Sequence, residues 1–241
     1  MKKYGLIGYP LTHSFSPKFF AEKFEDEGIQ AEYKSYPIEQ AETFLKLFEQ
    51  GLSGLNVTIP YKEKVMPYLD KLSPEAKAIG AVNTIKKEGD LLVGYNTDVY
   101  GFEISLLYCE GYKCLANKGA LVLGSGGAAK AISYVLNKLG FEVSIVSRTA
   151  GDLRYSDLDE SVMRDNSLII NTTPLGMYPL VEHSPAIPYA YLGSQHLLYD
   201  LVYNPDKTVF LKNAEIQGAS IKNGAQMLIL QAEKSWEIWN E

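Results

Sequence analysis

The first hundred residues alternate between short apolar runs with strand character and longer segments with helical spacing. Residues 4–9 (YGLIGY) and 31–38 (AEYKSYPI) are typical of strands, and residues 41–51 (AETFLKLFEQG) are typical of a helix that ends at its glycine. The apolar, β-branched run over 55–59 predicts another strand, which ends at Pro60 because proline has no backbone N–H and a fixed φ. A short helix is expected after it. The pattern predicts strands alternating with helices.

Residues 14–28 (SFSPKFFAEKFEDEG) predict the helix between the first two strands. Ser16 is expected to cap this helix and Pro17 to occupy its first helical position, where a missing N–H costs little. Phe20 and Phe24 are four residues apart and therefore share one helix face. The chain is thus expected to begin with a strand followed by a helix.

The segment AVNTIKKEGDLLVGYNTD predicts a hairpin with strands at 82–86 and 91–95 and a turn at residues 88–90. Asn83 and Asp98 lie near the two outer ends of this hairpin. Because hairpin strands are adjacent in space, these two polar residues are expected to be neighbours although they are far apart in sequence.

A different pattern begins at residue 119. An apolar strand over 120–123 meets the glycine cluster at 124–127, and apolar residues over 128–139 then recur at the spacing of an amphipathic helix. A strand over 142–147 completes a β-α-β unit. In such units glycine lets the backbone approach a diphosphate, and the helix N-terminus offers unpaired N–H groups. The unit favours dinucleotide binding, and a purely structural tight turn is the alternative.

The second strand of this unit ends in Ser147, Arg148 and Thr149, where an NAD enzyme usually has an acidic residue that binds the ribose hydroxyls. A carboxylate would repel a 2′-phosphate, whereas a guanidinium and two hydroxyls suit it. The segment favours NADP over NAD. The alternative is an arginine that is only exposed in a loop.

Two further segments, 167–174 (SLIINTTP) and 196–205 (HLLYDLVYNP), predict additional strands of the same sheet. Both end in Thr, Pro, Tyr or Asn, which are suited to lining a cofactor crevice. A final helix is expected over 224–239, with one broad apolar face.

Composition limits the kinds of ligand. The chain has 241 residues and a formal net charge of -6 without a Lys/Arg cluster, which argues against nucleic-acid or membrane-surface binding and favours a small molecule. No segment approaches the ~18 apolar residues of a membrane span and no signal-peptide pattern is present, which predicts a cytoplasmic protein. Cys109 and Cys114 lack companions at metal-ligand spacing and are expected to be core thiols; no metal site is predicted.

Lys62 lies just beyond Pro60, at the exit of the strand predicted over 55–59. The crevice beyond the carboxyl ends of strands is the usual ligand site of α/β proteins. By its position alone, Lys62 is either a solvated charge on the first turn of a helix or a residue that meets a ligand.

Several motifs, spread in order along nearly the whole chain, give it a resemblance to the shikimate dehydrogenase family. They are GYPLTHSFSP, NVTIPYK, GAVNTI, GYNTDVYGF, GSGGAAKA, SRT, INTTPLGM, YDLVYNP and NGAQMLILQA. Their shared order, spacing and chemistry are far more specific than any one motif. The resemblance implies an α/β fold with an N-terminal α/β substrate domain over 1–100 and a doubly wound Rossmann NADP-binding domain over 101–219. It also implies a C-terminal helix over 220–241 that packs back on the substrate domain.

The activity implied by the resemblance is the reversible, NADPH-dependent reduction of 3-dehydroshikimate to shikimate, in aromatic amino-acid biosynthesis, by a monomer or homodimer. A quinate/shikimate dehydrogenase with broader cofactor use is an alternative, and Ser14 with Ser16 leans toward shikimate. A non-catalytic nucleotide-binding relative is disfavoured because Lys62 and Asp98 are both present.

The resemblance also implies roles for individual residues. Reduction of a ketone by hydride leaves an alkoxide that must take a proton, and Lys62, paired with Asp98, is the expected acid/base. The implied substrate-binding residues are Ser14, Ser16, Thr58, Asn83, Tyr203 and Gln231. The implied NADP-binding residues are Gly124, Gly126, Gly127, Ala128, Ser147, Arg148, Thr149, Thr172, Gly224 and Met227.

The chain departs from the family pattern after the second strand of the nucleotide unit. Ser147 stands before Arg148 where asparagine is commoner, and Arg154 comes later than the second basic residue that often follows. This departure predicts a weaker grip on the 2′-phosphate. His13 lies in the first motif and is expected to be structural, because the adjacent serines carry the family role.

Overall fold

The computed structural model describes residues 1–11 and 14–241, which divide into two compact units. The first unit comprises residues 1–100 and 231–241, and the second comprises residues 101–230. The sequence predicted one C-terminal helical element over residues 220–241. In the structure, residues 220–230 belong to the second unit, because residues 220–222 form a strand that pairs within the second sheet.

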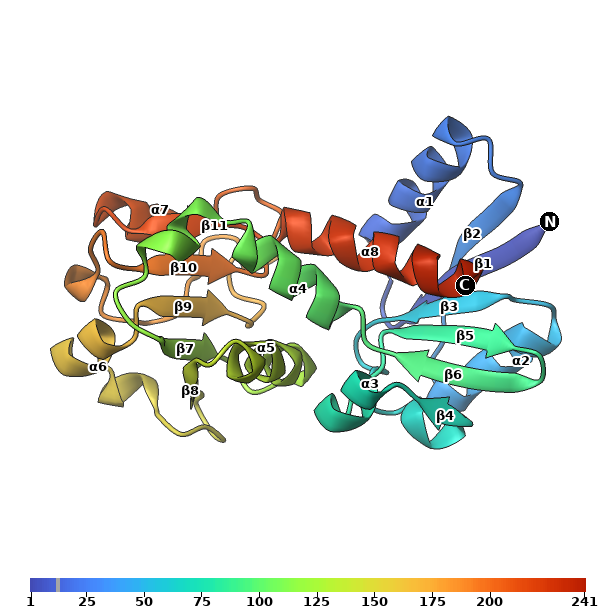
Figure 1. Ribbon diagram of the computed structural model, residues 1–241, viewed down its shortest axis with the longest axis horizontal. Helices are drawn as coiled ribbons and strands as arrows, with labels where there is room; N and C mark the ends of the chain where they lie inside the picture. The colour runs from blue at the N-terminus through green and yellow to red at the C-terminus, as the bar shows by residue number, and fades with distance from the viewer. Residues whose placement is uncertain (12–13) are drawn as a thin grey trace. The chain divides into compact units, whose positions relative to one another are not determined.

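The first unit contains a six-stranded sheet in the order β2-β1-β3-β5-β6-β4. Its strands are β1 (Lys2–Gly8), β2 (Ala31–Pro37), β3 (Gly54–Val57), β4 (Lys71–Leu72), β5 (Thr84–Glu88) and β6 (Leu91–Tyr95). β1 runs parallel to β2 and β3, and β3 runs antiparallel to β5. The predicted hairpin is confirmed as β5 and β6, whose register pairs Thr84 with Tyr95, and Gly89 adopts a φ of 62° in the turn (Figure 1).

The helices of the first unit differ in detail from the sequence pattern. They are α1 (Phe15–Asp26), α2 (Phe44–Glu49) after a 3₁₀ turn at Ala41–Thr43, and α3 (Pro74–Ile79). Ser16 was predicted to cap α1, but Ser14 holds the N-cap position and its side chain caps none of the described N–H groups. Pro17 therefore lies third in the helix, still within the first turn where a missing N–H is tolerated.

The helix expected directly after Pro60 is replaced by a turn, so the first-turn position considered for Lys62 does not exist. The chain forms only a 3₁₀ turn at Met66–Tyr68 before β4. Pro67 lies inside this turn, and proline cannot donate the bond that would extend it into a helix.

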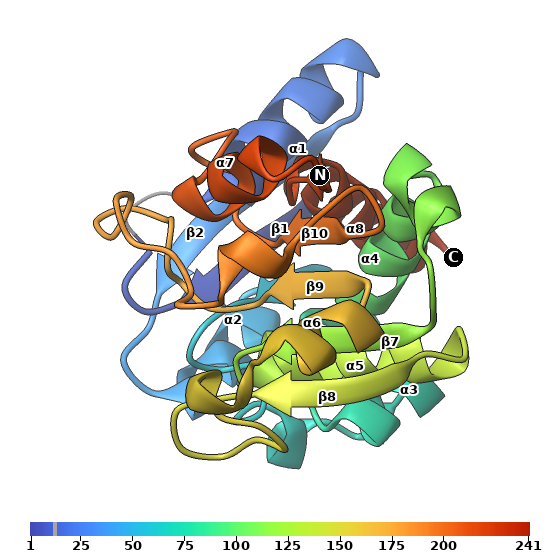
Figure 2. The same cartoon turned by 90° about the vertical axis from the view of Figure 1, so that its left-hand side faces the viewer.

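The second unit contains a five-stranded sheet in the order β11-β10-β9-β7-β8, in which all strands are parallel. Its strands are β7 (Gly119–Leu123), β8 (Glu142–Val146), β9 (Leu168–Asn171), β10 (Leu197–Asp200) and β11 (Ser220–Lys222). Figure 2 shows β8, β7 and β9 next to one another. The chain passes from β7 to β8 on one side and then to β9 on the other, so the strand order reverses between β7 and β9. Ligands of such sheets bind at this reversal.

Helices connect the parallel strands: α5 (Gly127–Lys138) follows β7, α6 (Glu160–Asp165) follows β8, and α7 (Val209–Ile216) follows β10. The Rossmann-type β-α-β unit predicted over 119–149 is confirmed. Short 3₁₀ turns at Glu110–Cys114, Tyr155–Asp157 and Tyr189–Tyr191 complete the unit. Cys109 is buried as predicted, but Cys114 is exposed, so the prediction of two core thiols was wrong for Cys114.

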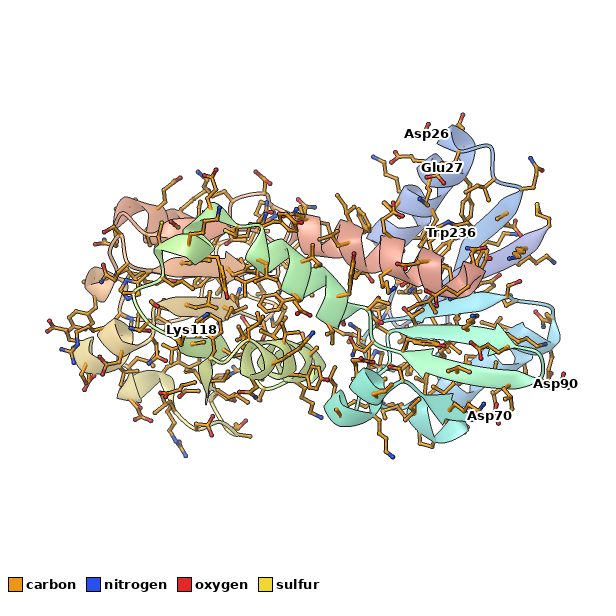
Figure 3. The ribbon with its side chains drawn as sticks, viewed as in Figure 1. Asp26, Glu27, Asp70, Asp90, Lys118 and Trp236 are labelled. Atoms are coloured by element: carbon orange, nitrogen blue, oxygen red, sulfur yellow. The ribbon has the colours of Figure 1, made fainter. Side chains whose placement is uncertain are left out.

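Two helices continue across the division between the units, α4 (Asp98–Leu107) and α8 (Ala225–Asn240). The last turns of α8 pack on the first sheet: the Trp239 ring stacks on Tyr4 with centroids 4.7 Å apart, and its Nε1 donates to the Ile85 carbonyl at 3.0 Å. Trp236, labelled in Figure 3, contacts Phe24 of α1 at 5.2 Å between centroids. These aromatic contacts fix residues 231–241 in the first unit. Within the described parts of the chain, none of the helices is long and apolar enough to cross a membrane.

A carboxylate is buried in the second unit at the end of β10. Asp200 is fully buried and accepts hydrogen bonds from Thr208 Oγ1 at 2.6 Å, Asn171 Nδ2 at 2.9 Å and the Val202 backbone N–H at 3.0 Å. Burial nevertheless dominates and raises the pKa of Asp200 from 3.8 to about 6.

This raised pKa predicts a pH-dependent stability. The folded chain binds the Asp200 proton more tightly than the unfolded chain, so this contribution to stability is lost as pH rises from about 4 to 6. Relative to Asp200→Asn, the free energy of unfolding of the unmodified protein should be about 2 kcal/mol higher at pH 4.5 than at pH 7. Urea unfolding of both proteins at the two pH values measures this difference. If the free energy of unfolding changed equally with pH in the unmodified protein and in Asp200→Asn, the prediction would be contradicted.

Candidate functional site

Lys62 and Asp98 form an ion pair in the first unit. Lys62 Nζ donates to Asp98 Oδ2 at 2.6 Å, and the side chains are 22% and 13% exposed, so the pair is largely shielded but open to a ligand. Lys62 lies in the turn beyond β3 and Pro60, while Asp98 is the first residue of α4. The fold therefore gives the lysine a specific partner, which a solvated surface charge would not need.

Asn83 binds the other oxygen of the same carboxylate. Its Nδ2 donates to Asp98 Oδ1 and to Thr97 Oγ1, each at 3.0 Å, and its Oδ1 accepts from the Thr97 backbone N–H at 2.7 Å. Because that N–H requires an acceptor, the amide of Asn83 has only one orientation, with its nitrogen toward Asp98. The prediction that Asn83 and Asp98 are neighbours is confirmed, as the β5–β6 register requires.

A buried polar network that the sequence did not reveal lies behind Asn83. Asn56 Nδ2 donates to Ser235 Oγ at 3.0 Å and to Thr84 Oγ1 at 3.2 Å, and the two hydroxyls are 2.8 Å apart. Asn56 Oδ1 accepts from the Tyr33 hydroxyl at 2.8 Å. The only sequence signal was an asparagine inside an apolar strand, since Ser235 and Tyr33 come from distant elements.

The remaining predicted substrate residues lie on several elements. Ser14 and Ser16 are partly exposed at the start of α1, and the Ser16 side chain hydrogen-bonds Tyr33, whose pKa is raised by burial. Thr58 follows β3, and its N–H donates to the Ile7 carbonyl at 2.9 Å. Gln231 is buried on α8 in the first unit.

Two other residues named from the sequence do not belong to the described part of the first unit. Tyr203 belongs to the second unit, is partly buried there, and has its pKa raised by that burial. His13 lies outside the residues that the structure describes, so its expected structural role stays a prediction.

The second unit presents a glycine at the reversal of strand order. Gly124 follows β7 with a φ of 113°, which side-chain-bearing residues rarely adopt, and a Cβ there would lie 2.6 Å from Thr172 Oγ1. Thr172 follows β9, and its hydroxyl donates to the Leu123 carbonyl at 2.7 Å. Gly124 and Thr172 therefore lie together at the carboxyl ends of the adjacent strands β7 and β9.

The start of α5 fits an anionic group. Gly126 holds its N-cap position, and apart from its own residue and its two chain neighbours no described atom lies within 4 Å of where a Cβ would be. The first N–H groups of a helix lack intrahelical partners and favour a diphosphate, and Gly126 leaves room for one. Gly127 and the partly exposed Ala128 form the first turn of this helix. These residues fit the dinucleotide that the sequence favours.

The end of β8 carries the residues predicted to bind the ribose. Ser147 is buried, and its Oγ accepts from the Thr149 N–H at 3.4 Å, while Arg148 and Thr149 are exposed. The chain then returns: Leu153 bridges Val146, and the Ser147 N–H donates to the Leu153 carbonyl at 3.0 Å. Arg154 follows Leu153 directly, so its backbone lies beside the end of β8 despite its later position in sequence.

Gly224 and Met227 are the last of the predicted cofactor residues. Gly224 is buried just before α8, and its N–H donates to the Val202 carbonyl at 3.2 Å. A Cβ at Gly224 would overlap the Leu201 carbonyl oxygen, so this close backbone contact requires glycine. Met227 is buried in the first turn of α8.

Known proteins resemble the chain over almost its whole length. Residues 6–85 match the family described as the shikimate dehydrogenase substrate binding domain. A shikimate dehydrogenase (NADP(+)) of Clostridium beijerinckii is 42% identical over 254 residues, covering 100% of this chain and 93% of the relative.

Solved structures of shikimate dehydrogenases are also similar to the chain over nearly its whole length. Shikimate 5-dehydrogenase from Thermus thermophilus, in complex with NADP(H) and shikimate, is 33% identical with a TM-score of 0.86, covering 99% of this chain and 93% of that one. Shikimate 5-dehydrogenase from Listeria monocytogenes, in complex with shikimate and NAD, is 29% identical with a TM-score of 0.87, covering 99% and 91%. With a relative 42% identical across nearly all its residues, this chain belongs to the shikimate dehydrogenase family.

Proposed function

We propose that this protein catalyses the reversible, NADPH-dependent reduction of 3-dehydroshikimate to shikimate, a step of aromatic amino-acid biosynthesis. The observation that carries the proposal is the Lys62–Asp98 ion pair of 2.6 Å, with Asn83 on the second carboxylate oxygen. Family membership supplies the reaction, and this pair supplies the proton chemistry that the reaction needs. The presence of both Lys62 and Asp98 disfavours a non-catalytic nucleotide-binding relative, which would be expected to lose at least one of them.

In this proposal Lys62 donates the proton to the substrate oxygen. NADPH, when bound, supplies the hydride. The Lys62 ammonium has three N–H donors, of which Asp98 takes one, so others can reach the ketone oxygen, polarise it and protonate it as it becomes an alcohol. Asp98 aims the ammonium, and Asn83 holds Asp98. In the reverse direction Lys62 accepts the proton from the substrate hydroxyl.

The substrate is proposed to bind mainly to the first unit. Ser14 and Ser16 provide hydroxyls at the start of α1 for the substrate carboxylate, where the positive end of the helix dipole also favours an anion. Three polar side chains are assigned to the substrate ring: Thr58, Asn83 and Gln231. Tyr203 of the second unit is assigned to the same substrate.

The cofactor is proposed to bind at the carboxyl ends of the second sheet. The diphosphate is assigned to the start of α5 over Gly126, Gly127 and Ala128, and the 2′-phosphate to Ser147, Arg148 and Thr149. The residues assigned to the remainder of the dinucleotide are Gly124, Thr172, Gly224 and Met227. The cytoplasmic location and the choice between monomer and homodimer stay predictions.

Steady-state assays with both substrates and both cofactors test this function. Following nicotinamide absorbance, we expect kcat/KM for shikimate with NADP to exceed that for quinate with NADP, or shikimate with NAD, by about tenfold or more. Comparable rates with quinate and NAD would favour the quinate/shikimate alternative. Failure to turn over any pair, by a folded protein, would favour a non-catalytic relative.

A further inference from the structure

The buried carboxylate of Asp200 has no part in the mechanism above, yet it joins three segments of the second unit. Its Oδ1 accepts from Asn171 at the end of β9 and from the Val202 N–H just beyond β10. Its Oδ2 accepts from Thr208, the N-cap residue of α7. Oδ1 therefore binds the ends of β9 and β10, whereas Oδ2 binds the start of α7.

At the end of β9, Asn171 connects Asp200 to the following loop through hydrogen bonds. Asn171 Nδ2 donates to the Leu175 carbonyl at 3.1 Å as well as to Asp200. Its Oδ1 accepts from both the backbone N–H of Thr173, at 3.0 Å, and the Thr173 hydroxyl, at 2.6 Å. Since Thr172 lies between these anchored residues, its position at Gly124 depends on the orientation of the Asn171 amide.

On the β10 side, Asp200 anchors the segment that contacts Gly224. The Val202 N–H is bound by Asp200, while the Val202 carbonyl accepts from the Gly224 N–H at 3.2 Å. The missing side chain of Gly224 allows the close approach of Leu201. The residue pair 201–202 is thus held between Asp200 and the start of α8, and Tyr203 follows immediately.

We propose that Asp200 is a positioning residue that sets the loops after β9, β10 and β11 in the arrangement that binds the dinucleotide. It does so through Oδ1, without touching the ligand. The bond from Oδ2 to Thr208 serves a different purpose, the stability of the α7 start, where Thr208 also accepts from the Leu211 N–H. The identity of the ligand as NADPH rests on the proposed function; the mechanical role of Asp200 does not.

Two substitutions at Asp200 distinguish the roles of its two carboxylate oxygens. Asp200→Ala removes both, whereas Asp200→Asn can keep Oδ1 toward Asn171 and Val202 and turn its NH₂ toward the Thr208 oxygen. Calorimetric titration with NADPH, well below the unfolding temperature, should show Kd raised about tenfold or more in Asp200→Ala and within about threefold of wild type in Asp200→Asn.

Matched variants at the two partners keep the test informative even where Asp200→Ala fails to fold. Asn171→Ser removes the amide that donates to Oδ1 and leaves only a shorter hydroxyl, and Thr208→Val removes the hydroxyl that donates to Oδ2. Both should lower Tm, but only Asn171→Ser should weaken NADPH binding. Equal Kd values for the two variants, or wild-type Kd in a folded Asp200→Ala, would overturn the proposal.

Amide hydrogen exchange without ligand tests the same role independently of the proposed function. Asn171→Ser should speed exchange at Thr173 and Leu175, and Asp200→Ala should also speed it at Val202. Thr208→Val should speed exchange at the start of α7 alone. If wild-type protein bound no NADPH, the proposed function would fail while this exchange pattern still decided the role of Asp200; uniform acceleration in all variants would reject it.

Discussion

Replacement of Lys62 by alanine is expected to lower kcat by about 10² to 10⁴, the usual contribution of a positioned acid or base. The physical reason is the loss of the ammonium that Asp98 holds at 2.6 Å, which leaves the reduced oxygen without its proton donor. NADP affinity should change much less, because Lys62 lies in the first unit and the proposed dinucleotide residues lie in the second. Steady-state kinetics with shikimate and NADP, together with titration of NADP alone, measure both effects.

Lys64→Ala is the matched control, since Lys64 is an exposed lysine two residues further along the same turn. Its kcat should stay near the wild-type value. Asp98→Asn keeps the shape of the carboxylate but removes its charge, so it should also slow turnover. Because Lys62 and Asp98 act as one unit, the double variant should be much less impaired than the sum of the single effects predicts. A Lys62→Ala protein with near wild-type kcat would remove Lys62 from the mechanism.

Local patterns in the sequence predicted the parts of the site that depend on neighbouring elements. The hairpin of β5 and β6 was evident from its turn residues, and its register places the segments that carry Asn83 and Asp98 side by side. The glycine cluster before α5 likewise specified a β-α-β unit, because φ of 113° at Gly124 and the open space at Gly126 are requirements of backbone geometry. Such features are encoded within about thirty residues of one another, the length of a single motif.

The parts that escaped prediction depend on contacts between distant segments. Ser235 joins Asn56 and Thr84 only because aromatic residues near the end of α8 dock that helix on the first sheet. Helical periodicity placed Ser235 on a helix but did not predict its hydrogen-bond partners. The Ser16 cap was wrong for a local reason: Pro17 is acceptable anywhere in the first turn, so it does not define where the turn begins.

Arg154 illustrates the same limit on the cofactor side. Counted along the chain, it comes later than the second basic residue of the family pattern. In the structure the chain folds back on β8 at Leu153, which forms a β-bridge with Val146. The backbone of Arg154 therefore lies close to Ser147. Spacing in sequence underestimates proximity wherever a loop closes on the strand that it leaves.

Arg148→Ala is expected to weaken NADP by about 10- to 150-fold and to leave NAD nearly unchanged. A hydrogen bond to a charged group contributes about 1.5 to 3 kcal/mol, which at 1.4 kcal/mol per tenfold gives this range. Arg148 is exposed, and solvent competes for an exposed guanidinium, so the lower end is expected. Titration of each protein with NADP and with NAD measures the two affinities.

Arg154→Ala and Ser147→Asp complete the test of this 2′-phosphate site. If Arg154 also reaches the phosphate, its removal should weaken NADP alone, and the double arginine variant should bind NADP no more tightly than NAD. Ser147→Asp should shift preference toward NAD, because a carboxylate accepts from the ribose hydroxyls and repels the phosphate. Equal weakening of NADP and NAD by Arg148→Ala would mean that the arginine supports the loop rather than the phosphate. If Arg154→Ala also weakened both cofactors alike, the end of β8 would have no charged group that discriminates between them, and the quinate/shikimate alternative with broader cofactor use would gain support.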